Sequence, residues 1–134
     1  MAVTAIDREP DQQPDSAGLT KIGADLETRG PWPLGSQRFD LVVVTNYLHR
    51  PILGTIIDAV APGGLLLYET FAVGNERFGK PSNPDFLLQP GELKRAVAGR
   101  LEIIAFEEVE LGAPRPAVMQ RIAARAPIER GRRS

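Results

Sequence analysis

The chain has 134 residues, of which 43% are hydrophobic and 25% charged, as is typical of a single globular domain. Its 16 basic and 17 acidic side chains give a net charge of −1, which argues against a nucleic-acid-coating protein. The absence of cysteine and the single histidine exclude disulfide scaffolds and the common zinc sites, so we expect no bound metal. No apolar run approaches the ~20 residues of a membrane span, and the N-terminus has no secretory signal pattern. We therefore expect a cytoplasmic protein without a membrane partner.

The first half of the sequence predicts parallel strands. Four aliphatic or β-branched stretches end in polar residues, as buried parallel strands do: Val3–Ile6, Leu19–Gly23, Phe39–Thr45 and Gly64–Tyr68. Pro51 and the apolar residues after it, spaced as on one helix face, predict a helix that stops at Pro62-Gly63-Gly64. Residues 39–70 therefore form a predicted β-α-β unit.

The second half predicts an ordered loop over Ala72–Gln89, a short helix over Pro90–Ala98, and an antiparallel hairpin of strands Leu101–Glu110 and Ala117–Ala126. The predicted fold class is therefore α/β, a mostly parallel sheet that ends in an antiparallel hairpin. We expect one domain over residues 1–126, followed by an Arg-rich tail over 127–134. We interpret this tail as solvated and do not expect nucleic acid as its partner.

Polar residues follow each of the four predicted parallel strands, where ligands bind in open α/β sheets. Asp7 could accept two hydrogen bonds from a ribose diol, although a solvated loop acid or a helix cap would look the same. Asp25 could accept from the exocyclic amine of adenine beside the backbone of Leu26, with the same alternative. Asn46 and Glu69 follow the next two strands. We expect Asn46 and Glu69 to be neighbours on one rim.

The segment Asn46-Tyr47-Leu48-His49-Arg50 concentrates polar chemistry behind an apolar strand. His49 could act as a general base near neutral pH or serve as a structural hydrogen-bonding group. Arg50 could clamp a substrate carboxylate or phosphate, or form a salt bridge with Glu69. The loop 74–84 could be a lid over this rim or a loop packed on itself. No phosphate loop, nucleophile elbow or G-x-G-x-x-G turn follows any predicted strand, which disfavours a nicotinamide-dinucleotide enzyme.

The order of motifs resembles a known enzyme family. The motifs are the strand before Asp7, residues 24–27 (ADLE), residues 31–34 (PWPL), the run from Phe39 to Arg50, residues 62–72 from Pro-Gly-Gly to Ala, and residues 74–79 (GNERFG). In this order they are similar to the class I S-adenosylmethionine-dependent methyltransferases, especially small bacterial proteins related in pattern to tellurite-resistance methyltransferases. The resemblance covers residues 2–126.

The resemblance implies a Rossmann-like sheet, S-adenosylmethionine as cofactor, and roles for particular residues. Asp7 would hold the ribose hydroxyls, Arg8 would lie beside the adenine, and Asp25 and Leu26 would contact its edge. Asn46 and Tyr47 would line the passage between the methionine end of the cofactor and the substrate. His49, Arg50 and Glu69 would lie on the substrate side. Tyr47, His49, Arg50 and Glu69 are therefore the candidate catalytic residues.

The sequence departs from the family pattern at its N-terminal end. The family places a strand and a glycine-rich turn, which binds the methionine part of the cofactor, before the strand that ends here at Asp7. We therefore expect a partial, N-terminally incomplete sheet, weak or no cofactor binding, and an unpaired central strand edge through which copies could associate. Two functions remain open: methyl transfer to an unidentified acceptor, with a small molecule favoured, and a non-catalytic binding module that needs a partner chain.

Overall fold

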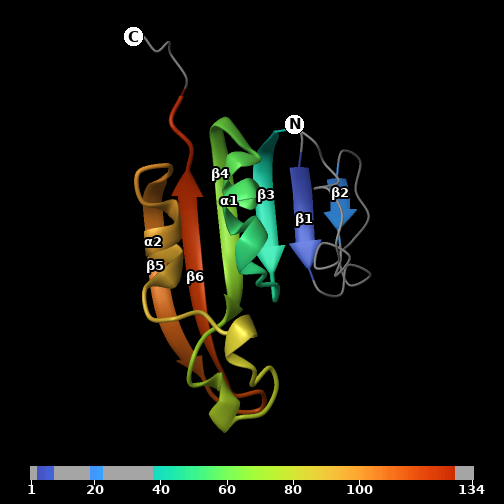
Figure 1. Ribbon diagram of the computed structural model, residues 1–134, viewed down its shortest axis with the longest axis vertical. Coiled ribbons are helices and arrows are strands. Elements are labelled where there is room, and N and C mark those ends of the chain that lie inside the picture. The colour runs from blue at the N-terminus through green and yellow to red at the C-terminus, as the bar shows by residue number, and fades with distance from the viewer. Residues whose placement is uncertain (1–2, 8–18, 23–37, 129–134) are drawn as a thin grey trace.

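The computed structural model describes residues 3–7, 19–22 and 38–128. Six strands form one sheet in the order β2-β1-β3-β4-β6-β5 (Figure 1). β1, β2, β3 and β4 run parallel, whereas β6 is antiparallel to both β4 and β5. The strands are β1 (Val3–Asp7), β2 (Leu19–Ile22), β3 (Phe39–Thr45), β4 (Val60–Phe71), β5 (Glu102–Leu111) and β6 (Ala117–Arg125). The predicted α/β class and the C-terminal hairpin are confirmed.

The central strands of the sheet are paired on both sides, so our expectation of an unpaired central strand edge was wrong. β1 pairs with β2 on one side and with β3 on the other, in register from Val3 opposite Leu41 to Asp7 opposite Thr45. The family's front strand is not needed to satisfy these backbone groups, because β1 and β3 hydrogen-bond directly. Within the described residues the sheet ends at β2 and β5. A central edge therefore offers no basis for self-association.

The strand order places a topological switch point between β1 and β3. From β1 the chain moves outward to β2, and from β3 it moves outward in the opposite direction to β4. In open α/β sheets, ligands bind outside the carboxyl ends of the strands at such a point. Asp7 ends β1 and Thr45 ends β3, so the predicted ribose-binding position lies at the switch point.

β4 is longer than the sequence suggested at both ends. It begins at Val60 and includes Pro62-Gly63-Gly64, which we had interpreted as the turn before the strand. Gly64 is needed there because a Cβ atom would lie 2.8 Å from the carbonyl oxygen of Ala61 and 3.0 Å from that of Asp40. At its other end β4 continues to Phe71, because β6 pairs with it along residues 65–71. Glu69 therefore lies within the strand rather than after it.

Two short helices cover one face of the sheet and enclose the core. Helix α1 (Leu53–Asp58) lies against β3 and β4, and helix α2 (Glu92–Val97) lies against β5 and β6 (Figure 1). Alternate strand residues point toward these helices, as the two-residue period of a strand requires. Each fully buried aliphatic side chain contributes about 1.5–3 kcal/mol. The central members of this core are Val42, Val44, Leu66, Tyr68, Ile122, Ala124, Ile56, Ile57, Leu93 and Val97.

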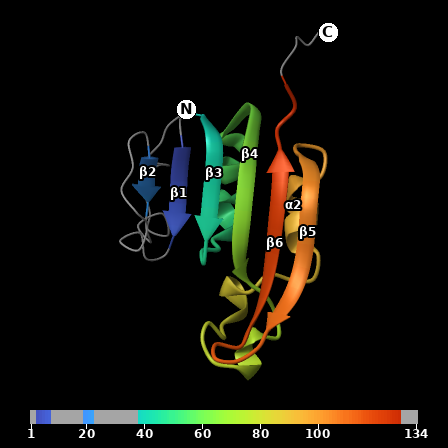
Figure 2. The ribbon, with the colours of Figure 1, turned by 180° about the vertical axis from the view of Figure 1, so that it is seen from behind.

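The opposite face of the sheet carries no helix in the described part of the chain, as the view from behind shows (Figure 2). Val43, Leu67 and Ala123 occupy directly paired positions across β3, β4 and β6. Leu67 is 37% exposed. A hollow of about 340 Å³ lies over these three residues and the neighbouring part of β5. One side of the sheet is thus a packed core and the other is a partly exposed apolar surface.

The loop after β4 is held tightly by backbone and side-chain hydrogen bonds. The side chain of Asn75, 2% exposed, accepts from the backbone N–H of Val118 at 3.0 Å and donates to the carbonyl oxygen of Pro81 at 3.0 Å. Gln120, fully buried, donates to the carbonyl oxygen of Gln89 at 2.6 Å. The loop includes the 3-10 turns η4 (Asn75–Arg77) and η5 (Pro84–Phe86). These contacts favour the packed-loop interpretation over a lid that presents Asn75 to a ligand.

No helix among the described residues is long and apolar enough to cross a membrane.

Candidate functional site

The carboxyl end of β3 has an unusual backbone conformation. Asn46, directly after Thr45, has φ +54°, in the left-handed region that side chains other than those of Asn and Asp seldom adopt. Its N–H donates to the carbonyl oxygen of Glu69 at 2.9 Å, so the predicted proximity of residues 46 and 69 is correct for the backbone. Its side chain is exposed. The turn thus presents an exposed amide side chain at the switch point, next to the register position that Asp7 shares with Thr45.

Three of the predicted cofactor residues, Arg8, Asp25 and Leu26, lie outside the described residues, and Asp7 is placed by its backbone alone. The placement of Asp7 at the carboxyl end of β1 fits the ribose-bearing half of a nucleoside cofactor, because a carboxylate can accept hydrogen bonds from hydroxyl groups. The sequence supplies no glycine-rich turn after β1 or β3 for the other half. The residues present therefore fit part of S-adenosylmethionine rather than all of it.

His49 lines a hollow of about 380 Å³ beside this rim. It precedes the 3-10 turn η3 (Arg50–Ile52), and its carbonyl oxygen accepts from the N–H of Ile52 at 3.1 Å. Pro51 stands at the first positions of this turn, as predicted, since proline suits a helix start. The hollow is lined by Leu48, His49, Arg50, Pro51, Asp85 and Phe86. It combines an imidazole, a carboxylate and an aromatic ring, a set that can bind a small polar molecule and accept its proton.

Arg50 links the residues around this hollow through hydrogen bonds of its guanidinium group. Its Nε donates to Oε2 of Glu92 at 2.7 Å and its Nη2 to Oε1 at 2.9 Å. It also donates to the carbonyl oxygens of Leu87, at 2.8 Å, and Asp85, at 3.2 Å. Hydrogen bonding to Arg50 holds the pKa of Glu92 below its ordinary value, although burial opposes this, and the same contact raises the pKa of Arg50. The alternative of a salt bridge from Arg50 is therefore correct, but with Glu92 as the partner instead of Glu69.

Tyr47 is fully buried within the core, so it supports the rim from below. Its carbonyl oxygen accepts a hydrogen bond from the hydroxyl of Tyr68 at 2.8 Å. Burial raises the pKa of Tyr68 well above its ordinary value, so this phenol remains a donor at neutral pH. The two tyrosines fix the chain where it leaves β3 toward His49.

The carboxylate of Glu69 is bound by the hairpin rather than by the segment that carries His49. Its carboxylate accepts from Nε of Arg121 at 2.9 Å, and Nη1 of Arg121 lies 3.7 Å from Glu107. These three residues occupy one register row across β4, β6 and β5. Glu69 and Arg121 border the hollow on the helix-free face, whereas His49 and Arg50 border the other one. Of the four catalytic candidates, only His49 and Arg50 line the same hollow.

Sequence reasoning missed Asp85 and Phe86, which complete the hollow around His49, and Glu92, which pairs with Arg50. They are separated from Arg50 by 35 or more residues along the chain. Nothing in the sequence predicted that the second half of the loop after β4 would fold back onto η3. Within the described residues, no group of three or more histidine and acidic side chains could hold a metal ion.

Comparison with known proteins gives the fold. No protein-family model and no curated protein matches the chain. Among solved structures, a chain of the complex between a methyltransferase activator of Haloferax volcanii and a proposed methyltransferase is similar at 11% identity and TM-score 0.64, covering 96% of this chain and 83% of that one. An S-adenosylmethionine-dependent methyltransferase of Methanosarcina mazei is similar at 16% identity and TM-score 0.60, with coverage of 96% and 83%.

A third structure has a cofactor product bound. The N-methyltransferase NodS of Bradyrhizobium japonicum, in complex with S-adenosylhomocysteine, is similar at 17% identity and TM-score 0.57, covering 94% of this chain and 67% of that one. Likeness at these identities extends over nearly the whole chain and concerns its architecture. The chain has the fold of the class I S-adenosylmethionine-dependent methyltransferases.

Proposed function

We propose that the protein binds S-adenosylmethionine at the switch point between β1 and β3 and transfers its methyl group to a small molecule in the His49 hollow. The observation that carries the proposal is the position of Asp7 and Asn46 at the carboxyl ends of the two switch-point strands, in a methyltransferase fold. Ligands of open α/β sheets bind at this place.

On the cofactor side, the carboxylate of Asp7 accepts hydrogen bonds from the ribose hydroxyls, and Asn46 lies between the cofactor and the acceptor. Arg8, Asp25 and Leu26 contact the adenine in this proposal. Because no glycine-rich turn follows β1 or β3, we expect few backbone contacts to the methionine part of the cofactor. We therefore expect a dissociation constant near 1 mM, or about −4 kcal/mol.

On the acceptor side, the reaction needs positioning and one proton acceptor. When bound, the cofactor supplies an electrophilic methyl group on a sulfonium. The hollow beside Asn46 holds the acceptor so that its nucleophilic atom faces the cofactor, which is the main source of acceleration for such a transfer. An imidazole nitrogen of His49 takes the proton that the acceptor loses. Asp85 and Phe86 bind the rest of the acceptor, whereas Arg50 keeps η3 and the loop in place through Glu92.

The experiment is a calorimetric titration with S-adenosylhomocysteine, made on the wild-type chain, Asp7→Ala and the matched control Glu102→Gln. Glu102 is an exposed acid at the start of β5, away from the switch point. We expect millimolar binding that Asp7→Ala weakens at least about tenfold, the loss of one charge-assisted contact, and that Glu102→Gln leaves unchanged. Equal affinity in the wild type and Asp7→Ala would contradict the proposed site.

A binding module without catalysis is the second candidate, and the helix-free face of the sheet favours it. Leu67 is 37% exposed there, over a hollow of about 340 Å³ bordered by Glu69 and Arg121. A partner chain that covers this face would bury the apolar row and shield the ion pair from water. Complete absence of S-adenosylhomocysteine binding, together with a dimeric or mixed complex in solution that Leu67→Glu abolishes, would favour this second function.

A further inference from the structure

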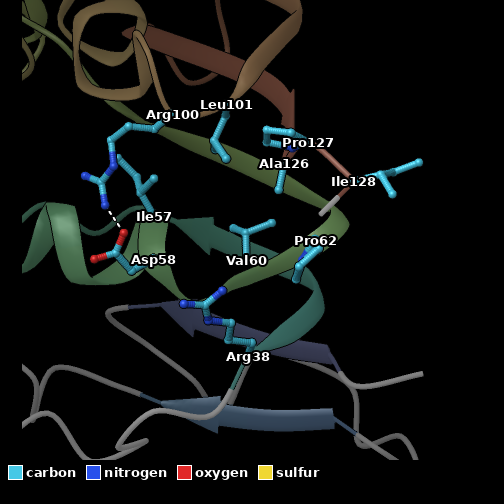
Figure 3. A pocket seen from close by; sticks show the side chains of 10 residues that line it. All are labelled: Arg38, Ile57, Asp58, Val60, Pro62, Arg100, Leu101, Ala126, Pro127 and Ile128. Carbon is cyan, nitrogen blue, oxygen red and sulfur yellow. Dashed lines mark hydrogen bonds and ion pairs between the residues drawn. The ribbon is translucent and has the colours of Figure 1, made fainter. Parts of the chain in front are cut away.

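A third pocket lies at the opposite end of the sheet from Asn46 and His49. It has a volume of about 520 Å³ and is formed where β3 and β4 begin, where β5 begins and where β6 ends (Figure 3). Cavities of about 300–1,000 Å³ are typical of small-molecule sites. Its lining combines two arginines and one acid, Arg38, Arg100 and Asp58, with apolar side chains.

The floor of this amino-end pocket is apolar and belongs to the core. Ile57 and Val60 are 4% and 5% exposed, and Leu101 and Ala126 are 9% and 6% exposed. Because these side chains are packed from behind by the core, the floor is preformed. Ile128, at the edge of the pocket, is 70% exposed. A ligand that covers the floor and contacts Ile128 would remove apolar surface from water.

The charges around the pocket favour an anion. Arg100 is neutralised, because its guanidinium forms an ion pair with Asp58 and also donates to the carbonyl oxygen of Gly54 at 3.2 Å. Arg38 is exposed and lines the other side of the pocket (Figure 3). No hydrogen bond or ion pair joins Arg38 to another residue in the described part of the chain. The lining therefore has one uncompensated positive charge beside an apolar floor.

We propose that the amino-end pocket binds a small amphipathic anion, with its carboxylate on Arg38 and its apolar body on the floor made by Ile57, Val60, Leu101 and Ala126. An arginine can bind a carboxylate with two parallel hydrogen bonds. The occupant is a free monocarboxylate with a medium-length aliphatic chain or a ring of similar size. This site is independent of the proposed methyl transfer, because the two lie at opposite ends of the parallel strands.

The test is an amide ¹H–¹⁵N NMR titration of the whole chain with decanoate below its micelle-forming concentration. We expect saturable shifts of the amides of Asp58, Leu101 and Ala126, with much smaller shifts at Leu67 on the helix-free face. Arg38→Ala should weaken binding about fivefold, the upper range for an exposed charge pair. The matched control is Arg115→Ala, an exposed arginine in the turn between β5 and β6, which should bind decanoate as the wild type does.

Charge reversal at Arg38 distinguishes a site that selects anions from an apolar surface that binds any amphiphile. Arg38→Glu should lose decanoate binding and gain binding of decyltrimethylammonium, which the wild type should not bind at this pocket. Equal binding of the two amphiphiles by the wild type, unchanged decanoate affinity in Arg38→Ala, or shifts centred on Leu67 would each overturn the proposal. Because Arg38 is exposed and has no described partner, these variants test binding rather than folding.

Discussion

The ion pair of Arg50 and Glu92 fastens η3 to α2, and its removal should measurably loosen the fold. Arg50→Ala deletes two hydrogen bonds to a carboxylate and two to backbone carbonyl oxygens. Hydrogen bonds to charged groups contribute about 1.5–3 kcal/mol, but solvent screens part of this. The Arg50 side chain is 36% exposed and that of Glu92 is 15% exposed. The mostly buried Glu92 carboxylate would remain without its cation, so we expect a loss of about 2–3 kcal/mol in the free energy of unfolding.

Urea unfolding followed by circular dichroism measures this loss, and a double-mutant cycle with Glu92→Ala isolates the pair. We expect a coupling energy of about 1–2 kcal/mol at pH 7. Because the pKa of Glu92 is lowered in the folded protein, the pair stabilises the fold above the usual glutamate pKa of about 4.3. This contribution is lost as the pH falls through the lower folded pKa. A coupling energy near zero at pH 7, or one that grows toward low pH, would refute the reasoning.

Two further substitutions test the close packing of β4 and the role of His49. Gly64→Ala should destabilise the fold by about 2 kcal/mol or more, since its Cβ would meet backbone oxygens of residues 39, 40 and 61, whereas Gly112→Ala, with nothing within 4 Å, should be close to neutral in the same unfolding assay. His49→Ala should lower the rate of methyl transfer by about 100-fold without changing S-adenosylhomocysteine affinity. An unchanged rate would leave His49 with only its structural place before η3.

The sequence was sufficient for the approximate positions of the strands, because the signals for these are local. The β-branched run of β3 lies between polar residues and was predicted to the residue, Phe39–Thr45. The ends of β4 were not, because they depend on partners far away: Gly64 fits against β3, and Phe71 pairs with Met119. The direct pairing of β1 with β3 was also missed, because the resemblance placed a strand between them.

The site shows the same division between local and distant information. The turn at Asn46 and the start of η3 at Pro51 could be anticipated, because asparagine tolerates a positive φ and proline suits a first helical turn. The salt-bridge partner of Arg50 could not be predicted from the sequence, because either Glu69 or Glu92 could lie next to Arg50, depending on the fold. Glu69 instead pairs with Arg121 because the hairpin brings β6 beside β4.

The central claim is that the switch point between β1 and β3 is the cofactor site, and an amide NMR titration with S-adenosylhomocysteine tests it most directly. We predict saturable shifts of the amides of Asp7, Thr45 and Asn46, with a dissociation constant near 1 mM and little change at Asp58 or Leu101 at the other end of the sheet. No saturable shift at these three amides, or shifts confined to the amino-end pocket, would contradict it.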